Sequence, residues 1–179
     1  MKIRSFLKLV EIQTKAASMV PFIFGTVFAL YRYRQFDFWN FLFMLISLLS
    51  FDMTTTAINN YQDYKRAKKK KGFGYERHNA IVRDHLEETT VRTVILVLLA
   101  VAVTFGILLY RRTSLVALIT GIVSFAVGIL YTCGPVPISR MPLGECFSGF
   151  FMGFVIIFLS VWIQIPDETL AYLTFAGGL

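Results

Sequence analysis

The segment FWNFLFMLISLLSFDMTTTAINNYQDYKRAKKKK, residues 38–71, decides the fold of this chain. Its first part is almost wholly apolar, and from Asn59 onward it becomes polar and ends in a run of lysines. About 20 apolar residues, each adding about 1.5 Å, carry a helix across the hydrocarbon core of a bilayer. The segment therefore predicts a membrane-spanning helix that emerges into a strongly charged loop.

The rest of the chain is also strongly apolar. The 179 residues are 56% hydrophobic, include 18 Phe and have a mean hydropathy of +0.63, which is more apolar than one soluble core requires. An all-α, polytopic transmembrane helix bundle is predicted, with five spans at residues 16–33, 38–61, 91–110, 115–133 and 146–165. A sixth apolar stretch begins near Leu170 and stops at Leu179. We therefore expect residues 1–179 to form a single membrane domain that is incomplete.

The excess of positive charge is explained by membrane topology and not by binding to nucleic acid. The 18 Lys and Arg outnumber the 11 Asp and Glu, but they flank apolar segments, which argues against a nucleic-acid partner. With five spans, 14 of these cations fall on one side of the bilayer and 4 on the other. Cytoplasmic loops carry the excess of Lys and Arg. We expect an integral protein of a bacterial-type cell membrane, with the N-terminus and a polar loop at residues 62–90 in the cytoplasm.

Polar residues on the second predicted span share one helical face. At about 3.6 residues per turn, spacings of four, three and four stack the residues Asp52, Thr56, Asn59 and Asp63, with Asn60 beside them. A carboxylate as deep as Asp52 is costly toward lipid, so we expect it to face a cavity or a partner within the bundle. Such a stripe is either a packing seam between helices or one wall of a site.

The cations that follow this stripe favour a site. Carboxylate and amide oxygens are ligands for Mg²⁺, which takes few protein ligands and completes its shell with water and phosphate oxygens. Lys and Arg side chains could hold the remaining phosphate oxygens. The pattern is typical of a site for a lipid diphosphate, whose tail would lie among Phe-rich helices and whose head would lie in the polar mouth of the bundle.

Four short motifs occur in order along the chain. They are EIQTKAAS at residues 11–18, NNYQDYKR at 59–66, AIVRD at 80–84, and YTCGP through PLGE at 131–145. Together they resemble the motifs of the UbiA-type intramembrane prenyltransferases, and most of all the 1,4-dihydroxy-2-naphthoate polyprenyltransferase branch of menaquinone biosynthesis. The resemblance covers nearly the whole chain. It implies Mg²⁺-dependent transfer of a polyprenyl group from its diphosphate to an aromatic quinone precursor such as 1,4-dihydroxy-2-naphthoate.

The same resemblance implies roles for individual residues. Metal ligands are implied at Asn59 and Asp63, with Asn60 beside them as a third catalytic position. The residues implied in substrate binding form three sets: diphosphate contacts at Lys65, Arg66 and Arg83, an orienting partner for Arg83 at Asp84, and the aromatic side of the cavity at Lys15 and Asp52.

The sequence departs from this family in two ways. The first aspartate-rich motif is usually NDxxDxxxD, and here Asn60 stands at its first Asp and Ala67 at its third, which predicts weaker Mg²⁺ binding. Members also have about nine spans of about 20 residues each, with a second aspartate-rich motif after the sixth, and this chain stops before that motif. The resemblance thus implies a missing C-terminal half. The 179 residues alone are not expected to catalyse the full reaction.

Two other classes of function stay open. A transporter or channel fragment would use Asp52 and the polar stripe as an ion path, although the later predicted spans carry no second charge deep in the membrane. A non-catalytic membrane anchor or partner-binding module would use the lysine run at residues 68–71 to bind anionic lipid.

Overall fold

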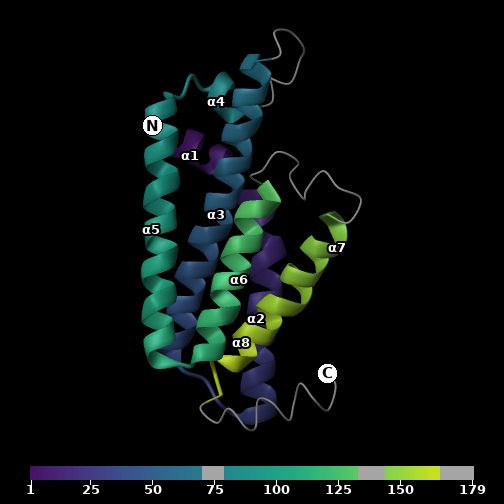
Figure 1. Ribbon diagram of the computed structural model, residues 1–179. Coiled ribbons are helices and arrows are strands. Elements are labelled where there is room, and N and C mark those ends of the chain that lie inside the picture. Colours follow the sequence, from purple (N-terminus) through teal and green to yellow (C-terminus); the bar gives the residue numbers. More distant parts are fainter. Residues whose placement is uncertain (70–78, 133–143, 166–179) are drawn as a thin grey trace.

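The computed structural model describes residues 1–69, 79–132 and 144–165, and the regular structure in these ranges is helical. In chain order the elements are α1 (Ile3–Leu9), the 3₁₀ turn η1 (Ile12–Lys15), α2 (Ala16–Tyr33), α3 (Phe38–Lys69), α4 (Ala80–Arg83), α5 (Glu88–Arg112), α6 (Leu115–Thr132), α7 (Gly144–Gly149), the π-helical turn η4 (Phe150–Val155) and α8 (Ile156–Trp162). The long helices run up and down beside one another as one bundle (Figure 1). The all-α fold class predicted from the sequence is confirmed.

Each of the five apolar segments is helical over most of its described part, and the helix of the fifth ends at Trp162. Four helical stretches are long and apolar enough to cross a membrane: Ile12–Tyr33, Phe38–Arg66, Glu88–Arg112 and Gly144–Trp162. The remaining one, Leu115–Tyr131, is shorter and lies near the lower limit of about 17 residues for a span. The apolar stretch expected from Leu170 lies outside the described residues.

The charged segment after the second span begins as helix. α3 continues without a break to Lys69, because Gln, Lys, Arg and Ala favour helix and because this extension packs on the start of α5. There Arg92 Nε donates to Tyr61 Oη at 2.7 Å, and Tyr61 Oη donates to Glu88 Oε2 at 3.3 Å. Residues 62–90, which the sequence predicted as a loop, are therefore helical at their beginning and again in α4 and the start of α5.

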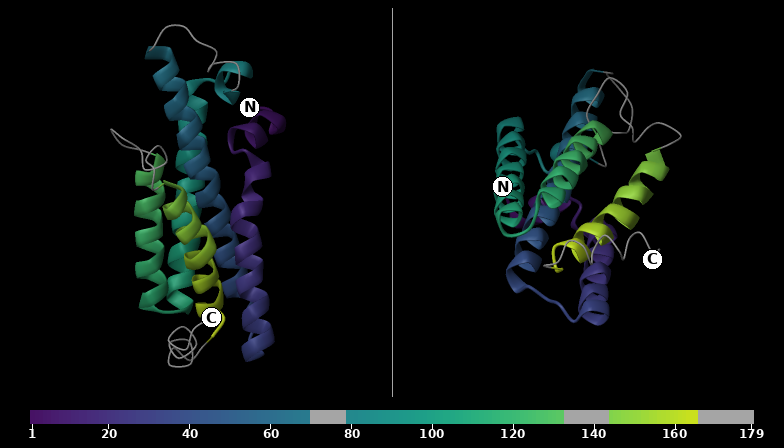
Figure 2. Two further views of the ribbon diagram at one scale, coloured as in Figure 1. Left: turned by 90° about the vertical axis from the view of Figure 1, so that its right-hand side faces the viewer. Right: turned by 60° about the horizontal axis from the view of Figure 1, so that its bottom comes forward.

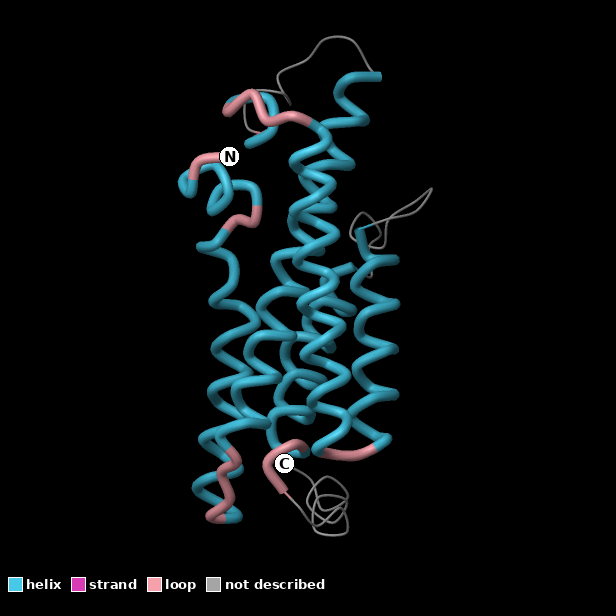
Figure 3. The backbone as a smooth tube through the Cα atoms, turned by 90° about the vertical axis from the view of Figure 1, so that its left-hand side faces the viewer, coloured by secondary structure: helices cyan, strands magenta, loops and turns pink. Residues whose placement is uncertain are grey.

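The N-terminal segment lies at the same end of the bundle as this charged segment. α1 and α4 lie beside the end of α3 and the start of α5 (Figures 1 and 3). Leu9 and Val10 are fully buried there, and the cluster around Leu9 consists of Ala57, Tyr61, Ile81 and Val91. Glu11 then adopts a φ of 48°, which turns the chain into η1. The N-terminus and the charged segment share one end, as the count of cations predicts.

α2 and α8 pack closely against each other in the other half of the bundle (Figure 2). Gly25 is the point of closest approach, because a Cβ built there would come within 2.7 Å of the Ser160 Cβ and 2.9 Å of the Ile157 carbonyl oxygen. Phe22 and Trp162 belong to the apolar core beside this contact. α3 and α6 complete the wall around a common interior, which holds the candidate site.

Candidate functional site

A cavity of about 810 Å³ occupies the interior of the bundle. Its walls are mostly apolar side chains from α3, α5, α6 and the α7–α8 segment. Most polar lining side chains gather where η1, α2 and α3 meet: Glu11, Thr14, Ser18, Asp52, Thr55, Thr56 and Asn59. Further hydroxyl groups line the cavity elsewhere: Ser47, Tyr110, Ser124, Tyr131 and Ser148. A large apolar cavity with a few convergent polar groups is the usual form of a small-molecule site in a protein.

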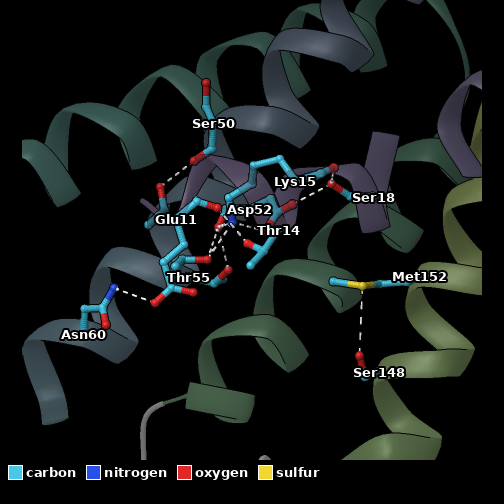
Figure 4. A network of polar contacts seen from close by, with 12 residues as sticks. Glu11, Thr14, Lys15, Ser18, Ser50, Asp52, Thr55, Asn60, Ser148 and Met152 are labelled. Carbon is cyan, nitrogen blue, oxygen red and sulfur yellow. Dashed lines mark hydrogen bonds and ion pairs between the residues drawn. The ribbon is translucent and has the colours of Figure 1, made fainter. Parts of the chain in front are cut away.

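Asp52 is the centre of the polar wall (Figure 4). Lys15 Nζ donates to Asp52 Oδ1 at 2.8 Å, and the Ser18 hydroxyl donates to the other carboxylate oxygen, Oδ2. The same ammonium group donates to Thr56 Oγ1 at 2.6 Å and to the Asp52 carbonyl oxygen at 3.2 Å. The sequence predicted that Asp52 faces a cavity or a partner, and it does both.

Lys15 is hidden behind this carboxylate. It is only 3% exposed and does not line the cavity, whereas Asp52 does. An ion pair so far from water is costly unless its geometry and its other hydrogen bonds are good, and here all three ammonium protons have acceptors. Of the two residues predicted for the aromatic side of the cavity, Asp52 reaches the cavity and Lys15 holds it from behind, and their aromatic role stays a prediction.

Asn59 and Asn60 point to different places, although they are neighbours. Asn59 is exposed and lines the cavity. Asn60 donates from Nδ2 to the carbonyl oxygen of Leu9 at 2.9 Å and to Glu11 Oε1 at 3.2 Å. Its backbone oxygen accepts from Asn79 Nδ2 at 2.7 Å. Asn60 therefore ties α3 to the N-terminal segment and to the residue that caps α4.

The remaining predicted residues of α3 lie beyond the polar wall. Asp63 follows Asn59 by about one helical turn and is half-buried. Lys65 and Arg66 are half-buried as well, and Lys65 Nζ lies 5.0 Å from the centre of the Tyr61 ring. These residues continue along the same helix toward its charged end and do not line the cavity.

Arg83 and Asp84 lie with the N-terminal helix. Asp84 Oδ1 is 3.8 Å from Lys8 Nζ and 3.5 Å from Arg83 Nε. The pKa of the Asp84 carboxyl lies below its usual value. The hydrogen bond with the Ser5 hydroxyl lowers this pKa most, partial burial opposes it, and the charges of Lys8 and Arg83 lower it further. Asp84 lines a separate polar recess beside α1, and neither Arg83 nor Asp84 lines the cavity. Their predicted contact with a diphosphate stays a prediction.

The polar wall offers few oxygen ligands for a metal ion. Within residues 1–69, 79–132 and 144–165, no three side chains of His, Cys, Asp or Glu gather closely enough to hold one. Asn59 and Asp63 present an amide and a carboxylate about one turn apart on α3. Mg²⁺ usually takes one or two protein carboxylates and completes its shell with water and substrate phosphate. An amide and a carboxylate at this spacing are ligand types that suit an ion shared with a diphosphate and not an all-protein cage, and their metal role stays a prediction.

Some wall residues were not predicted individually. Glu11, Thr14 and Ser18 line the cavity but were only quoted as part of a motif. One signal could have found Ser18, because it follows Lys15 by three residues and so lies on the same helical face at the start of the first span. Glu11 and Thr14 precede α2, and their position depends on the turn at Glu11.

Comparison with known proteins agrees with the motifs. Residues 18–179 match the sequence profile of the UbiA prenyltransferase family. A protein of Bacillus subtilis (strain 168) described as 1,4-dihydroxy-2-naphthoate octaprenyltransferase is 37% identical over 154 residues, which cover 84% of this chain and 48% of that protein. The chain thus spans about half the length of this curated relative. No solved structure matches the chain significantly.

Proposed function

The chain belongs to the UbiA prenyltransferase family, and on that premise we propose that it forms part of an enzyme that transfers a polyprenyl group to an aromatic quinone precursor. It is an integral membrane protein. The donor would be a polyprenyl diphosphate, and the acceptor would be 1,4-dihydroxy-2-naphthoate, after the description of the B. subtilis relative. Because the chain spans about half of that relative, we assign the complete reaction to a protein with a further, C-terminal half.

The observation that carries this proposal is the division of the cavity into an apolar body and one polar wall. A polyprenyl diphosphate has the same division. Its tail would lie against the apolar side chains of α5, α6 and the α7–α8 segment, and its head would lie toward Asn59 and the charged end of α3. The reacting allylic carbon would then lie among apolar groups, which keep water away from it.

The charged end of α3 supplies the groups that would hold the diphosphate. Asn59 and Asp63 would bind Mg²⁺ together with phosphate oxygens, and Mg²⁺ would supply charge neutralisation for the departing diphosphate. Lys65 and Arg66 would contact the phosphate oxygens directly, and Arg83, oriented by Asp84, would approach from α4. We place this end and the N-terminus in the cytoplasm, because 14 of the 18 cations lie on that side in the predicted topology.

The experiment uses the full-length parent protein in lipid nanodiscs with radiolabelled polyprenyl diphosphate and 1,4-dihydroxy-2-naphthoate. Asp63→Ala should abolish Mg²⁺-dependent transfer, because the proposed metal site would lose its carboxylate ligand. The matched control is Glu87→Ala, which removes an exposed carboxylate at the same end but away from the cavity. Unchanged turnover in Asp63→Ala would contradict the site assignment.

Binding separates this proposal from the other two classes of function. A soluble diphosphate analogue that binds only with Mg²⁺ supports the enzyme. Binding that follows the anionic lipid content of the nanodisc, with no effect of Mg²⁺, indicates a membrane anchor. Absence of both favours a transporter fragment, in which Asp52 and the polar stripe would form an ion path.

A further inference from the structure

Asp52 has hydrogen-bonding capacity left on the side that faces the cavity. A carboxylate offers about four lone-pair positions on its two oxygens. Lys15 donates to one oxygen and Ser18 to the other, and the side chain keeps 12% exposure where it meets the cavity. The carboxylate is therefore fixed in position and can still accept a hydrogen bond from a ligand.

Among the linked side chains of Lys15, Ser18 and Asp52, the carboxylate of Asp52 is the most exposed and lines the cavity, as the Glu11 carboxylate also does. Lys15 gives its three ammonium protons to Asp52 and Thr56 and is buried behind them. Ser18 is 1% exposed and gives its hydroxyl proton to the same carboxylate. The wall thus presents a negative hydrogen-bond acceptor to the cavity, and its positive charge is held out of reach.

We propose that Asp52 accepts a hydrogen bond from a ring hydroxyl of the aromatic acceptor, with Lys15 and Ser18 as positioning residues. The inference rests on the proposed function and adds the residue that would recognise a hydroxyl group of the acceptor ring. A hydroxyl is the donor that a fixed carboxylate binds well, and a charge-assisted bond of this kind is about twice as strong as a neutral one. An acceptor carboxylate would be repelled by Asp52 and would point elsewhere.

The distance along α3 agrees with this placement. Asp52 and Asn59 are seven residues apart, which is nearly two turns and about 10 Å of helix rise. A ring bound at Asp52 and a diphosphate bound near Asn59 would therefore be neighbours in one cavity, since both residues line it. Such a separation leaves room for the ring and the first carbons of the prenyl chain between the two anchoring points.

The test measures preference for a hydroxyl group and needs no turnover. The full-length protein in nanodiscs is titrated, under reducing conditions, with 1,4-dihydroxynaphthalene and with its 1,4-dimethyl ether. The unmodified protein should bind the diol about 10-fold to 100-fold more tightly than the ether, as expected for a hydrogen bond to a charged group. The double variant Lys15→Met/Asp52→Leu, which leaves no unpaired charge, should bind the two compounds with similar affinity.

Two further proteins control the interpretation. Thr26→Ala removes a buried polar group of α2 that bonds to the Phe22 carbonyl oxygen and does not line the cavity, so it should keep the preference. If the double variant fails to fold, the isosteric Asp52→Asn replaces it and should show a reduced preference. In transfer assays Asp52→Asn should raise KM for the aromatic acceptor and leave KM for the polyprenyl diphosphate unchanged.

The outcomes distinguish this inference from the proposed function. Mg²⁺-dependent binding of the diphosphate analogue without any preference for the diol would overturn the role of Asp52 and leave the prenyltransferase assignment intact. A preserved preference in the Asp52 variants would also overturn it. If the unmodified protein does not bind the diphosphate analogue, the proposed function itself is contradicted. A variant that is merely less stable, with its preference unchanged, would show that the ion pair is only structural.

Discussion

Asn60 donates a hydrogen bond from its side-chain amide to the carbonyl oxygen of Leu9, at 2.9 Å. The bond joins the last third of α3 to the residue that ends α1. The position therefore serves the packing of the N-terminal segment, which in turn leads to Glu11 and to the start of the polar wall. The family motif that this segment resembles has an Asp at this place, whereas this chain has an amide, which donates the hydrogen bond.

Asn60→Asp, which restores the usual motif, should therefore destabilise the protein. The carboxylate would face the Leu9 carbonyl oxygen and the Glu11 carboxylate, which are both acceptors. A lost bond that leaves a buried acceptor unsatisfied costs about 1–3 kcal/mol. The matched control is Asn59→Asp, because Asn59 is exposed at the cavity and a carboxylate there should keep stability and tighten Mg²⁺-dependent binding of a diphosphate.

Thermal unfolding in detergent, together with Mg²⁺ titration, measures both effects. The opposite pattern, with Asn60→Asp stable and binding Mg²⁺ more tightly, would show that Asn60 turns into the cavity and that the bond to Leu9 is dispensable.

The buried ion pair leads to a second prediction. Lys15→Met should cost about 3–5 kcal/mol, because it leaves the Asp52 carboxylate without its cation. Adding Asp52→Leu should recover most of that loss, since a neutral pair of similar volume needs no compensation. Unfolding free energies of the two single variants and the double variant form the cycle that measures this coupling. If the free-energy costs of the two single variants add up to the cost of the double variant, the two side chains do not stabilise each other.

Helical spacing predicted the polar wall well. Asp52 and Asn59 reach one cavity because seven residues make nearly two turns of helix. The hydrogen-bond partners of Asn60 could not be predicted from helical spacing. A step of one residue rotates the side chain by about 100°, and what it then meets depends on where Leu9 is buried. The end of α3 was placed too early as well, because its charged extension is held by Tyr61 and the start of α5.

Arg83 and Asp84 show a different limit of the sequence. The motif AIVRD relates them to the diphosphate, and the structure brings Asp84 to Ser5 and Lys8 of α1. Contacts between residues so far apart in the chain leave no local pattern, since they depend on how α1 and α4 pack on α3. The sequence therefore placed Asp52 and Asn59 at the cavity by helical spacing, but it gave no sign of the contacts that Asp84 makes with α1.

A third prediction concerns the contact between α2 and α8. Gly25→Ala should destabilise the protein by about 1–3 kcal/mol through overpacking, because its Cβ would meet backbone and side chain of α8 at 2.7–2.9 Å. Gly121→Ala on α6 is the control, since a Cβ there meets nothing within 4 Å. It should be neutral or slightly stabilising, as Ala favours helix over Gly. Chemical or thermal unfolding in detergent compares the two, and equal stabilities would mean that α2 and α8 can separate at no cost.

A fourth prediction concerns pH and the ion pair between Arg112 Nη2 and Asp37 Oδ2, at 3.0 Å. Burial raises the pKa of the Asp37 carboxyl, but the Asn40 backbone N–H and Arg112 outweigh it and hold this pKa below its usual value of 3.8. A carboxyl whose folded pKa is lowered contributes stability above its unfolded pKa and loses it as pH falls through the folded pKa. The contribution of Asp37 should therefore be complete above about pH 4 and disappear below it.

Arg112→Gln should bring the Asp37 pKa back toward its usual value, so the stability that Asp37 contributes above about pH 4 becomes smaller, and less stability is lost as the pH falls from about 4 to 2. At neutral pH the loss should be about 1 kcal/mol or less, because both side chains are partly exposed. Arg111→Gln, the neighbouring exposed arginine, is the control and should leave the acid transition in place. Unfolding followed from pH 7 to pH 2 measures the difference. Identical acid transitions in the two variants would mean that Arg112 does not stabilise the ionised form of Asp37.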